Sequence, residues 1–203
     1  MSGADSLWRT ARTLGRRWGR GKALPPLLFF TDPARTPHPE QVVAALPRGS
    51  AVVFRPFGAR DAVAQGRRLR ALARSRGVLF LVGADVALAT ALGADGLHLP
   101  QRLAHRAGAL RRAHPRWLVT AAAHGLASAL AAHRAGAHAV VLSPVFPSRS
   151  PSAGKALGVL KFSQLVGTVG GPVYALGGVH ALTARRLLLT RAAGVAAIDG
   201  LRN

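Results

Sequence analysis

With 203 residues, of which 49% are hydrophobic and 17% charged, the chain has the length and apolar content of a single folded domain. It contains no cysteine, which excludes disulfides, thiolate metal sites and cysteine nucleophiles. The formal charge of +21 predicts attraction to phosphorylated metabolites, nucleic acids or anionic membranes, but the arginines are spread over several predicted helices without an aromatic platform, which favours solvated helix faces over a specific nucleic-acid site.

Residues 1–24 form a basic extension whose apolar residues recur at helical spacing. They are Leu7, Trp8, Ala11 and Leu14, with arginines on the other face. The pattern predicts an amphipathic helix that packs on the following domain, with a membrane-surface or nucleic-acid arm as the alternative. No run reaches the roughly 18 apolar residues that span a membrane, and arginines stand where the apolar core of a signal peptide would lie. We therefore expect a cytoplasmic protein.

From Pro25 onward, short apolar runs alternate with longer arginine-studded helical patterns, which is typical of an α/β fold built from βαβ units with a parallel sheet. The predicted strands cover residues 27–30, 51–54, 78–82, 96–99, 118–121, 139–142, 173–176 and 195–198. The predicted helices begin after residues 39 and 59 and then cover 86–92, 104–113, 126–135, 160–166 and 181–192.

Eight strands with seven intervening helices predict a closed (β/α)8 TIM barrel over residues 25–203. An open doubly wound sheet competes, but it normally carries a glycine fingerprint after the first strand, where this chain reads Thr31, Asp32 and Pro33. Only five residues follow the last predicted strand, so we predict that the eighth helix is truncated. The extra N-terminal helix, or the neighbouring subunit of a homodimer, would then cover the barrel surface left open.

Four segments carry short motifs in a fixed order. They read Phe-Thr-Asp at 30–32, Gly-Ala-Asp-Gly-Leu-His-Leu-Pro-Gln at 93–101, Ser-Pro-Val-Phe-Pro-Ser at 143–148 and Ala-Leu-Gly-Gly-Val at 175–179. In these motifs and their spacing the chain resembles the thiamine phosphate synthase family, which includes the related thiazole tautomerases. The resemblance covers most of residues 27–200.

The resemblance implies a cytoplasmic transferase of thiamine biosynthesis. Such an enzyme joins hydroxymethylpyrimidine diphosphate to thiazole phosphate, uses magnesium and releases pyrophosphate, so its partners are phosphorylated small molecules. A leaving diphosphate needs a metal ion and cationic clamps, and the phosphate of the second substrate needs backbone N–H donors.

The resemblance places the thiazole phosphate on the turns after the last two strands. Gly177 and Gly178 allow close approach of the backbone, and Asp199 and Gly200 would supply further amides. The alternative is that the two glycines only form tight turns.

Two serines in the loop after the sixth strand, Ser148 and Ser150, match hydroxyl positions of the family and are candidate phosphate-binding residues. The lysine that follows in the family reads Pro151 here, with Arg149 or Lys155 as a candidate replacement for its charge. A solvated loop is the alternative.

Arg55 and His124 are the candidate catalytic residues. Arg55 is what remains of the family's Gln-Leu-Arg-Glu-Lys motif, and at the end of the second strand it would clamp the diphosphate. His124, after the fifth strand, would act as a general acid or base, although a hydrogen bond at a helix start also explains it. His98 and Gln101 of the 93–101 motif are further candidate pocket residues.

The expected magnesium ligands are replaced. The family's Asn-Asp after the third strand aligns with Gly83 and Ala84, and its Glu-Asp pair beyond Gln101 aligns with Arg102 and Leu103. We assign no metal ligand. Asp85 is a candidate through a shifted loop, and its alternative role is the N-cap of a helix.

Three hypotheses follow. The first is that the chain is a thiamine phosphate synthase that uses magnesium if active. The second is that it is a tautomerase-like or catalytically impaired phosphate-binding paralogue, although Pro144 stands where the tautomerases have their loop histidine. The third is a basic nucleic-acid or membrane-surface binder on a reused barrel, which would show strong salt dependence.

Overall fold

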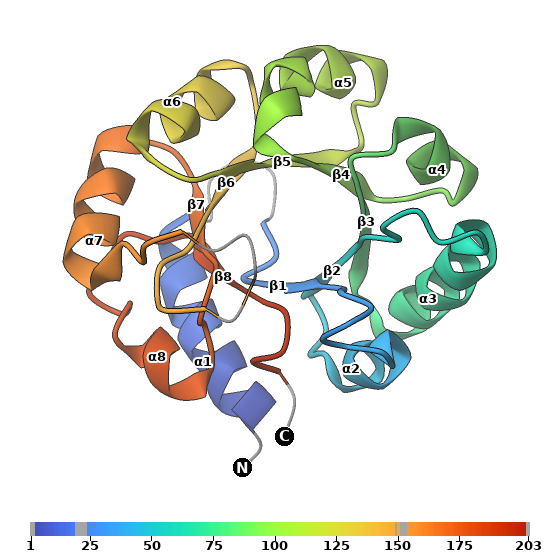
Figure 1. The fold of residues 1–203 in the computed structure, drawn as a ribbon, viewed down its shortest axis with the longest axis horizontal. Coiled ribbons are helices and arrows are strands. Elements are labelled where there is room, and N and C mark those ends of the chain that lie inside the picture. Colours follow the sequence, from blue (N-terminus) through green and yellow to red (C-terminus); the bar gives the residue numbers. More distant parts are fainter. Residues whose placement is uncertain (1–2, 19–23, 149, 151–153, 202–203) are drawn as a thin grey trace.

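The computed structural model describes residues 3–18, 24–148, 150 and 154–201. Within these residues, eight parallel strands form a closed barrel in sequence order, surrounded by helices (Figure 1). The strands are β1 (Leu27–Phe30), β2 (Ala51–Phe54), β3 (Leu79–Gly83), β4 (Gly96–Leu99), β5 (Leu118–Ala123), β6 (Ala139–Leu142), β7 (Val173–Ala175) and β8 (Gly194–Ala197). The strand β1 closes the barrel, because Phe29 lies opposite both Val52 of β2 and Ala197 of β8. The predicted TIM barrel is confirmed.

Helices follow each strand from β1 to β7. They are α2 (Pro39–Ala45), α3 (Ala62–Arg76), α4 (Val86–Ala91), α5 (Ala107–Ala113), α6 (Leu126–Arg134), α7 (Gly158–Val169) and α8 (Ala181–Arg185), while α1 (Gly3–Gly15) precedes the barrel and the 3-10 turns are η1 (Arg16–Trp18) and η2 (Gln101–Arg106). Among the described residues, no helix has both the length and the apolar character to cross a membrane.

Alternation along the strands divides the core into two layers. Leu28 and Phe30 point into the barrel, whereas Leu27 and Phe29 point outward to the helices. The inner layer is completed by Ala51, Val53, Leu81, Leu118, Ala139, Val141, Tyr174 and Ala196. Side chains therefore fill the barrel, and the open space for a ligand lies above them at the carboxyl ends of the strands.

The helix α1 lies beside α8 and packs against β8 and β1, as Figure 1 shows. Leu7, Ala11 and Leu14 are fully or almost fully buried, and the Trp18 indole donates a hydrogen bond of 3.1 Å to the carbonyl of Arg191. The described residues after β8 form turns, so α1 covers the surface that an eighth helix would cover. The extra helix predicted from sequence is thus confirmed; residues 1–2, 19–23 and 202–203 lie outside the described part of the chain.

The predicted helix over 181–192 is too long. The helix α8 ends at Arg185, and tight turns lead from there to β8. The amides of Leu187 and Leu188 donate to the carbonyls three residues back, and the Thr190 hydroxyl then donates to the carbonyl of Leu187 at 2.7 Å and accepts from the amide of Ala192 at 3.3 Å. Such local side-chain bonds offer the backbone an alternative to a helix.

Candidate functional site

Two adjoining cavities open at the carboxyl ends of the strands. The inner pocket, of about 170 Å³, lies over the barrel core, with Phe30 and His98 in its lining. The outer cleft, of about 930 Å³, extends toward α8 and includes His180 and Arg186 in its walls. The residues that line both are Arg35, Ser148, Gly178, Val179 and Asp199.

The turn at Gly177 and Gly178, after β7, lets two backbone segments come close together. Gly177 and Gly178 have φ values of +91° and +62°, in the left-handed region that favours glycine. A Cβ on Gly177 would stand 2.8 Å from Cα of Pro144, and one on Gly178 would overlap the carbonyl oxygen of Pro147. The turn therefore packs directly against the loop after β6 and excludes any side chain from this edge of both cavities.

Three amides at these turns lack acceptors. Across the described residues, the N–H groups of Gly177, Gly178 and Gly200 donate no hydrogen bond, and all three glycines line a cavity. Backbone donors that protein leaves unpaired bind water or a ligand, and several at one place suit an anion. Phosphate binding at the turns of Gly177, Gly178, Asp199 and Gly200 stays a prediction from the sequence.

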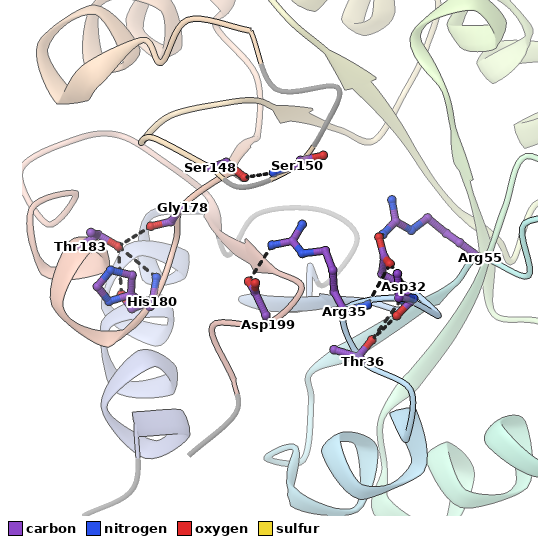
Figure 2. A network of polar contacts seen from close by, with 11 residues as sticks. Asp32, Arg35, Thr36, Arg55, Ser148, Ser150, Gly178, His180, Thr183 and Asp199 are labelled. Carbon is purple, nitrogen blue, oxygen red and sulfur yellow. Dashed lines mark hydrogen bonds and ion pairs between the residues drawn. The ribbon is translucent and has the colours of Figure 1, made fainter.

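The loop between β1 and α2 is held by its own aspartate. The Asp32 carboxylate accepts hydrogen bonds from the amides of Ala34 and Arg35 at 3.1 and 3.2 Å, while its backbone carbonyl accepts from the Thr36 amide at 2.7 Å (Figure 2). From this loop the Arg35 side chain reaches the turn after β8, where its guanidinium lies 2.7 Å from the Asp199 carboxylate. This ion pair stands where the two cavities meet.

Arg55 extends from the end of β2 into the inner pocket. Its Nε donates to the carbonyl of Thr31 at 2.8 Å, and its guanidinium lies over the rings of Phe30 and Phe57, at 5.3 and 4.9 Å from their centroids. Burial lowers the pKa of Arg55 to about 10, against the opposing attraction of Asp32, whose carboxylate lies 3.6 Å from Nη2. Arg55 is therefore charged at neutral pH, and its buried Nη2 donates no hydrogen bond within the described residues.

His124 is exposed on the opposite side of the inner pocket, after β5. Its Nδ1 lies 2.9 Å from the carbonyl oxygen of Ser143, which can only accept, so this nitrogen carries the proton. The other ring nitrogen, Nε2, then accepts or donates according to protonation. Gln101 stays outside both cavity linings, and its Oε1 accepts from the His124 amide at 3.2 Å, so it supports the turn that carries His124.

His98 forms part of the pocket floor. Its ring points into the barrel, with Nδ1 2.9 Å from the Thr120 hydroxyl and its edge against Phe30 at 4.8 Å between centroids. Burial, with a smaller effect of the Arg55 charge, lowers the pKa of His98 to about 3. The imidazole is therefore neutral at physiological pH and serves packing and hydrogen bonding.

The loop after β6 contributes hydroxyl groups. Ser148 lines both cavities, and Ser150 lines the inner pocket and donates its amide to the Ser148 hydroxyl at 3.3 Å. Arg149, a candidate replacement for the family's lysine, lies outside the described residues. Lys155, the other candidate, is exposed and lines neither cavity.

The described residues do not fit a magnesium site. Among them, no three His, Asp or Glu side chains gather as metal ligands. Asp32 and Asp199 each face an arginine, and Asp85 caps α4 by accepting from the Leu88 amide at 2.9 Å. Asp85 thus has the alternative role predicted for it. Magnesium needs carboxylate oxygens that face a shared point, and these three carboxylates are already engaged elsewhere.

Sequence analysis missed two residues of this site, Arg35 and Ser143. Arg35 stands five residues beyond the first strand, on a loop at the carboxyl end, and it is paired with a carboxylate in a chain that has only seven. With so few acidic residues among so many arginines, each aspartate at the mouth is expected to pair with a nearby arginine. This imbalance is the sequence feature that could have pointed to Arg35. Ser143 directly follows β6 and orients His124 through its backbone carbonyl. A backbone contact of this kind cannot be inferred from the pattern of side chains in the sequence.

The closed parallel barrel places this chain in the class of (β/α)8 barrels that keep their functional groups at the carboxyl ends of the strands. The thiamine monophosphate synthase family model matches residues 27–201. The chain therefore belongs to the thiamine monophosphate synthase family, as its motifs predict.

Individual relatives agree with this assignment. The thiamine-phosphate synthase of Pyrococcus furiosus is 29% identical over 179 residues, which are 86% of each chain. A provisionally named thiamine-phosphate synthase 2 of Aquifex aeolicus is 34% identical over 113 residues, 56% of this chain and 60% of that protein. The solved structure of a thiamine phosphate pyrophosphorylase from Pyrococcus furiosus superposes with a TM-score of 0.73 at 30% identity and covers 85% of each chain.

Proposed function

We propose that the protein is a transferase of thiamine biosynthesis that condenses hydroxymethylpyrimidine diphosphate with thiazole phosphate. The thiazole nitrogen forms a bond to the pyrimidine methylene carbon, the carbon–oxygen bond to the diphosphate breaks, and pyrophosphate leaves with the electron pair. No oxidant or reductant takes part. Its family membership and the names of its relatives support this reaction.

One observation carries the proposal. The inner pocket, which holds Arg55 and His124, adjoins the outer cleft at the Gly178 turn, where amides lack acceptors. A diphosphate beside Arg55 and a phosphate on the glycine turn would thus occupy neighbouring positions in one site, as a condensation requires.

In this proposal, Arg55 holds the leaving diphosphate. Its guanidinium is fixed by Thr31 and two aromatic rings, and its Nη2 donates no hydrogen bond within the described residues. His124 would donate a proton to the departing pyrophosphate through Nε2, because Nδ1 is engaged with Ser143. Ser148, Ser150 and the turn at Asp199 and Gly200 would complete the phosphate contacts, and His98 would shape the floor.

Magnesium has no step in this mechanism, since the described carboxylates do not form its site. The positive charge opposite the diphosphate is assigned to arginine instead. The same observation favours a second candidate, a phosphate-binding paralogue without transferase activity.

The deciding experiment measures thiamine phosphate formation from both substrates, with and without magnesium, beside titration calorimetry with thiazole phosphate. We expect turnover that falls at least about a hundredfold in Arg55→Ala, the scale of losing one electrostatic contact to a transition state. Arg68→Ala, an exposed residue of α3, is the matched control and should keep full activity. Thiazole phosphate binding without product in either metal condition would favour the inactive paralogue, and binding of neither substrate would contradict both.

The homodimer predicted from sequence stays a prediction. Light scattering coupled to size-exclusion chromatography would measure the mass of the 21.1 kDa chain in solution directly.

A further inference from the structure

We propose that Arg35 is the residue that selects phosphorylated ligands in this site, and that Asp199 holds its guanidinium at the glycine turn until a phosphate displaces the carboxylate. The inference rests on the proposed function in one respect: it takes a phosphate monoester as the ligand of the cradle, meaning the unpaired amides of Gly177, Gly178 and Gly200.

The position of the ion pair is the first argument. Arg35 and Asp199 each line both cavities, and their side chains meet at 2.7 Å across the mouth between the β1–α2 loop and the turn after β8 (Figure 2). Their side chains are 19% and 35% exposed, so the ion pair is partly buried and a ligand in solution can still reach it. A ligand on the cradle would contact this pair, because Asp199 is the chain neighbour of Gly200.

Charge is the second argument. The Asp199 carboxylate is an anion beside amides that suit an anion, and it would repel a phosphate placed there. Arg35 cancels that charge while the cradle holds no phosphate. A guanidinium presents a planar fork that binds carboxylate or phosphate with two parallel hydrogen bonds, so one arginine can exchange the first partner for the second.

The rigidity of the loop is the third argument. The Arg35 amide donates to the Asp32 carboxylate at 3.2 Å and to the Asp32 carbonyl at 3.1 Å, so the backbone stays in place while the side chain changes partner. Arg55 is less suited to this exchange, because Thr31, Phe30 and Phe57 fix its guanidinium toward the inner pocket.

Arg186 is the competing candidate for the phosphate contact. It lines the outer cleft, but its guanidinium lies over the Phe146 ring at 5.5 Å, and its side chain is exposed on the α8 side. The junction between the two cavities is lined by Arg35 and not by Arg186. This difference makes the choice between the two arginines measurable.

The test is titration calorimetry with three probes: inorganic phosphate, thiazole phosphate and the unphosphorylated thiazole alcohol. Arg35→Ala should weaken binding of both phosphates at least about tenfold and of the alcohol less than about twofold, as expected for loss of a charge-assisted contact. Arg35→Lys should retain part of the preference, because it keeps the charge without the fork. Asp199→Asn should bind phosphate more tightly than the wild type, because it removes the competing anion.

Three results would overturn the inference. They are an unchanged phosphate preference in Arg35→Ala, a loss in Asp199→Asn as large as that in Arg35→Ala, and a loss in Arg186→Ala that exceeds both. Arg185→Ala, an exposed α8 residue outside both cavities, is the control and should match the wild type. Thermal unfolding of each variant checks the fold, and Arg35→Lys and Asp199→Asn keep the test valid if Arg35→Ala does not fold.

The proposed function and this inference fail separately. An active synthase whose phosphate preference ignores Arg35 would refute only the inference. A protein that forms no thiamine phosphate but binds phosphates through Arg35 would refute only the transferase. Wild-type protein that binds neither inorganic phosphate nor thiazole phosphate would refute the inference outright.

Discussion

The two halves of the barrel mouth present different kinds of functional group. Around β7 and β8, the donors are backbone amides held by glycine turns, and their positions depend on chain conformation. Around β2 to β5, the functional groups are side chains such as Arg55 and His124, and they depend on residue identity. A half built from backbone amides therefore depends little on the identity of the neighbouring side chains, whereas a half built from side chains changes its chemistry when a few residues change.

Gly178→Ala should break the backbone-built half with the largest effect. An alanine Cβ would overlap the Pro147 carbonyl oxygen and would sit on a residue with φ of +62°. We expect thiazole phosphate affinity to fall at least about a hundredfold and stability to fall by about 1–2 kcal/mol from the left-handed strain. Calorimetry and urea unfolding measure the two losses.

A second glycine gives the control. Gly167→Ala on the exposed face of α7 has no heavy atom within 4 Å of the new Cβ, so it should raise stability by up to about 1 kcal/mol without changing affinity. If Gly178→Ala binds thiazole phosphate like the wild type, the cradle is not formed by this turn.

Leu7→Ala separates the scaffold from both halves of the mouth. Leu7 is fully buried between α1 and the barrel, so its truncation should cost about 2–5 kcal/mol of unfolding free energy. Ligand affinity at 25 °C should stay unchanged while the protein remains folded. A parallel loss of affinity would show that affinity tracks global stability, and losses in the mouth variants would then need that correction.

The neutral His98 predicts acid sensitivity on the side-chain-built half. Its pKa is lowered to about 3 from 6.5, so below pH 6.5 the unfolded chain takes up a proton that the folded chain refuses. His98 should therefore contribute a tenfold drop in the folding equilibrium for about each pH unit between 6.5 and 3. The measurement is Tm against pH for wild type and His98→Gln, and equal slopes for the two would contradict the prediction.

Asp85→Ala should have the smallest effect, and it tests whether Asp85 is a magnesium ligand or only the N-cap of α4. Removing the N-cap of α4 should cost about 1 kcal/mol of stability. Magnesium dependence of turnover, whatever its size in the wild type, should not change. A selective loss of that dependence would indicate that Asp85 is a metal ligand and would contradict its assignment as a helix cap alone.

The sequence predicts the barrel well because periodicity and order carry that information. Four of the eight strands have the predicted bounds, and the others shift by one or two residues. The predicted helix after β7 is too long, because Leu187, Leu188 and Leu189 continue the apolar pattern beyond Arg185, where the helix ends and local turns that include the Thr190 hydroxyl begin. A bond between a side chain and its local backbone leaves no mark on hydrophobic spacing.

The site is predicted less completely. Arg55, His124, Gly177 and Gly178 do meet at one set of cavities, because each follows a strand and parallel strands end at one edge. The partnership of Arg35 with Asp199 joins residues 164 positions apart, and its existence depends on side-chain rotamers that no local pattern specifies. The support that Gln101 gives to His124 is likewise a tertiary contact between loops.

The position of α1 has a consequence for synthesis of the chain. Its packing surface on β8 and α8 is encoded near the opposite end of the sequence, as the bond from Trp18 to Arg191 illustrates. A growing polypeptide must therefore carry Leu7, Ala11 and Leu14 without their final partners until the last strand has been translated. Closure of the barrel joins α1 to elements that are translated after it, so an interrupted translation product would expose the apolar face of α1 and present a target for chaperones.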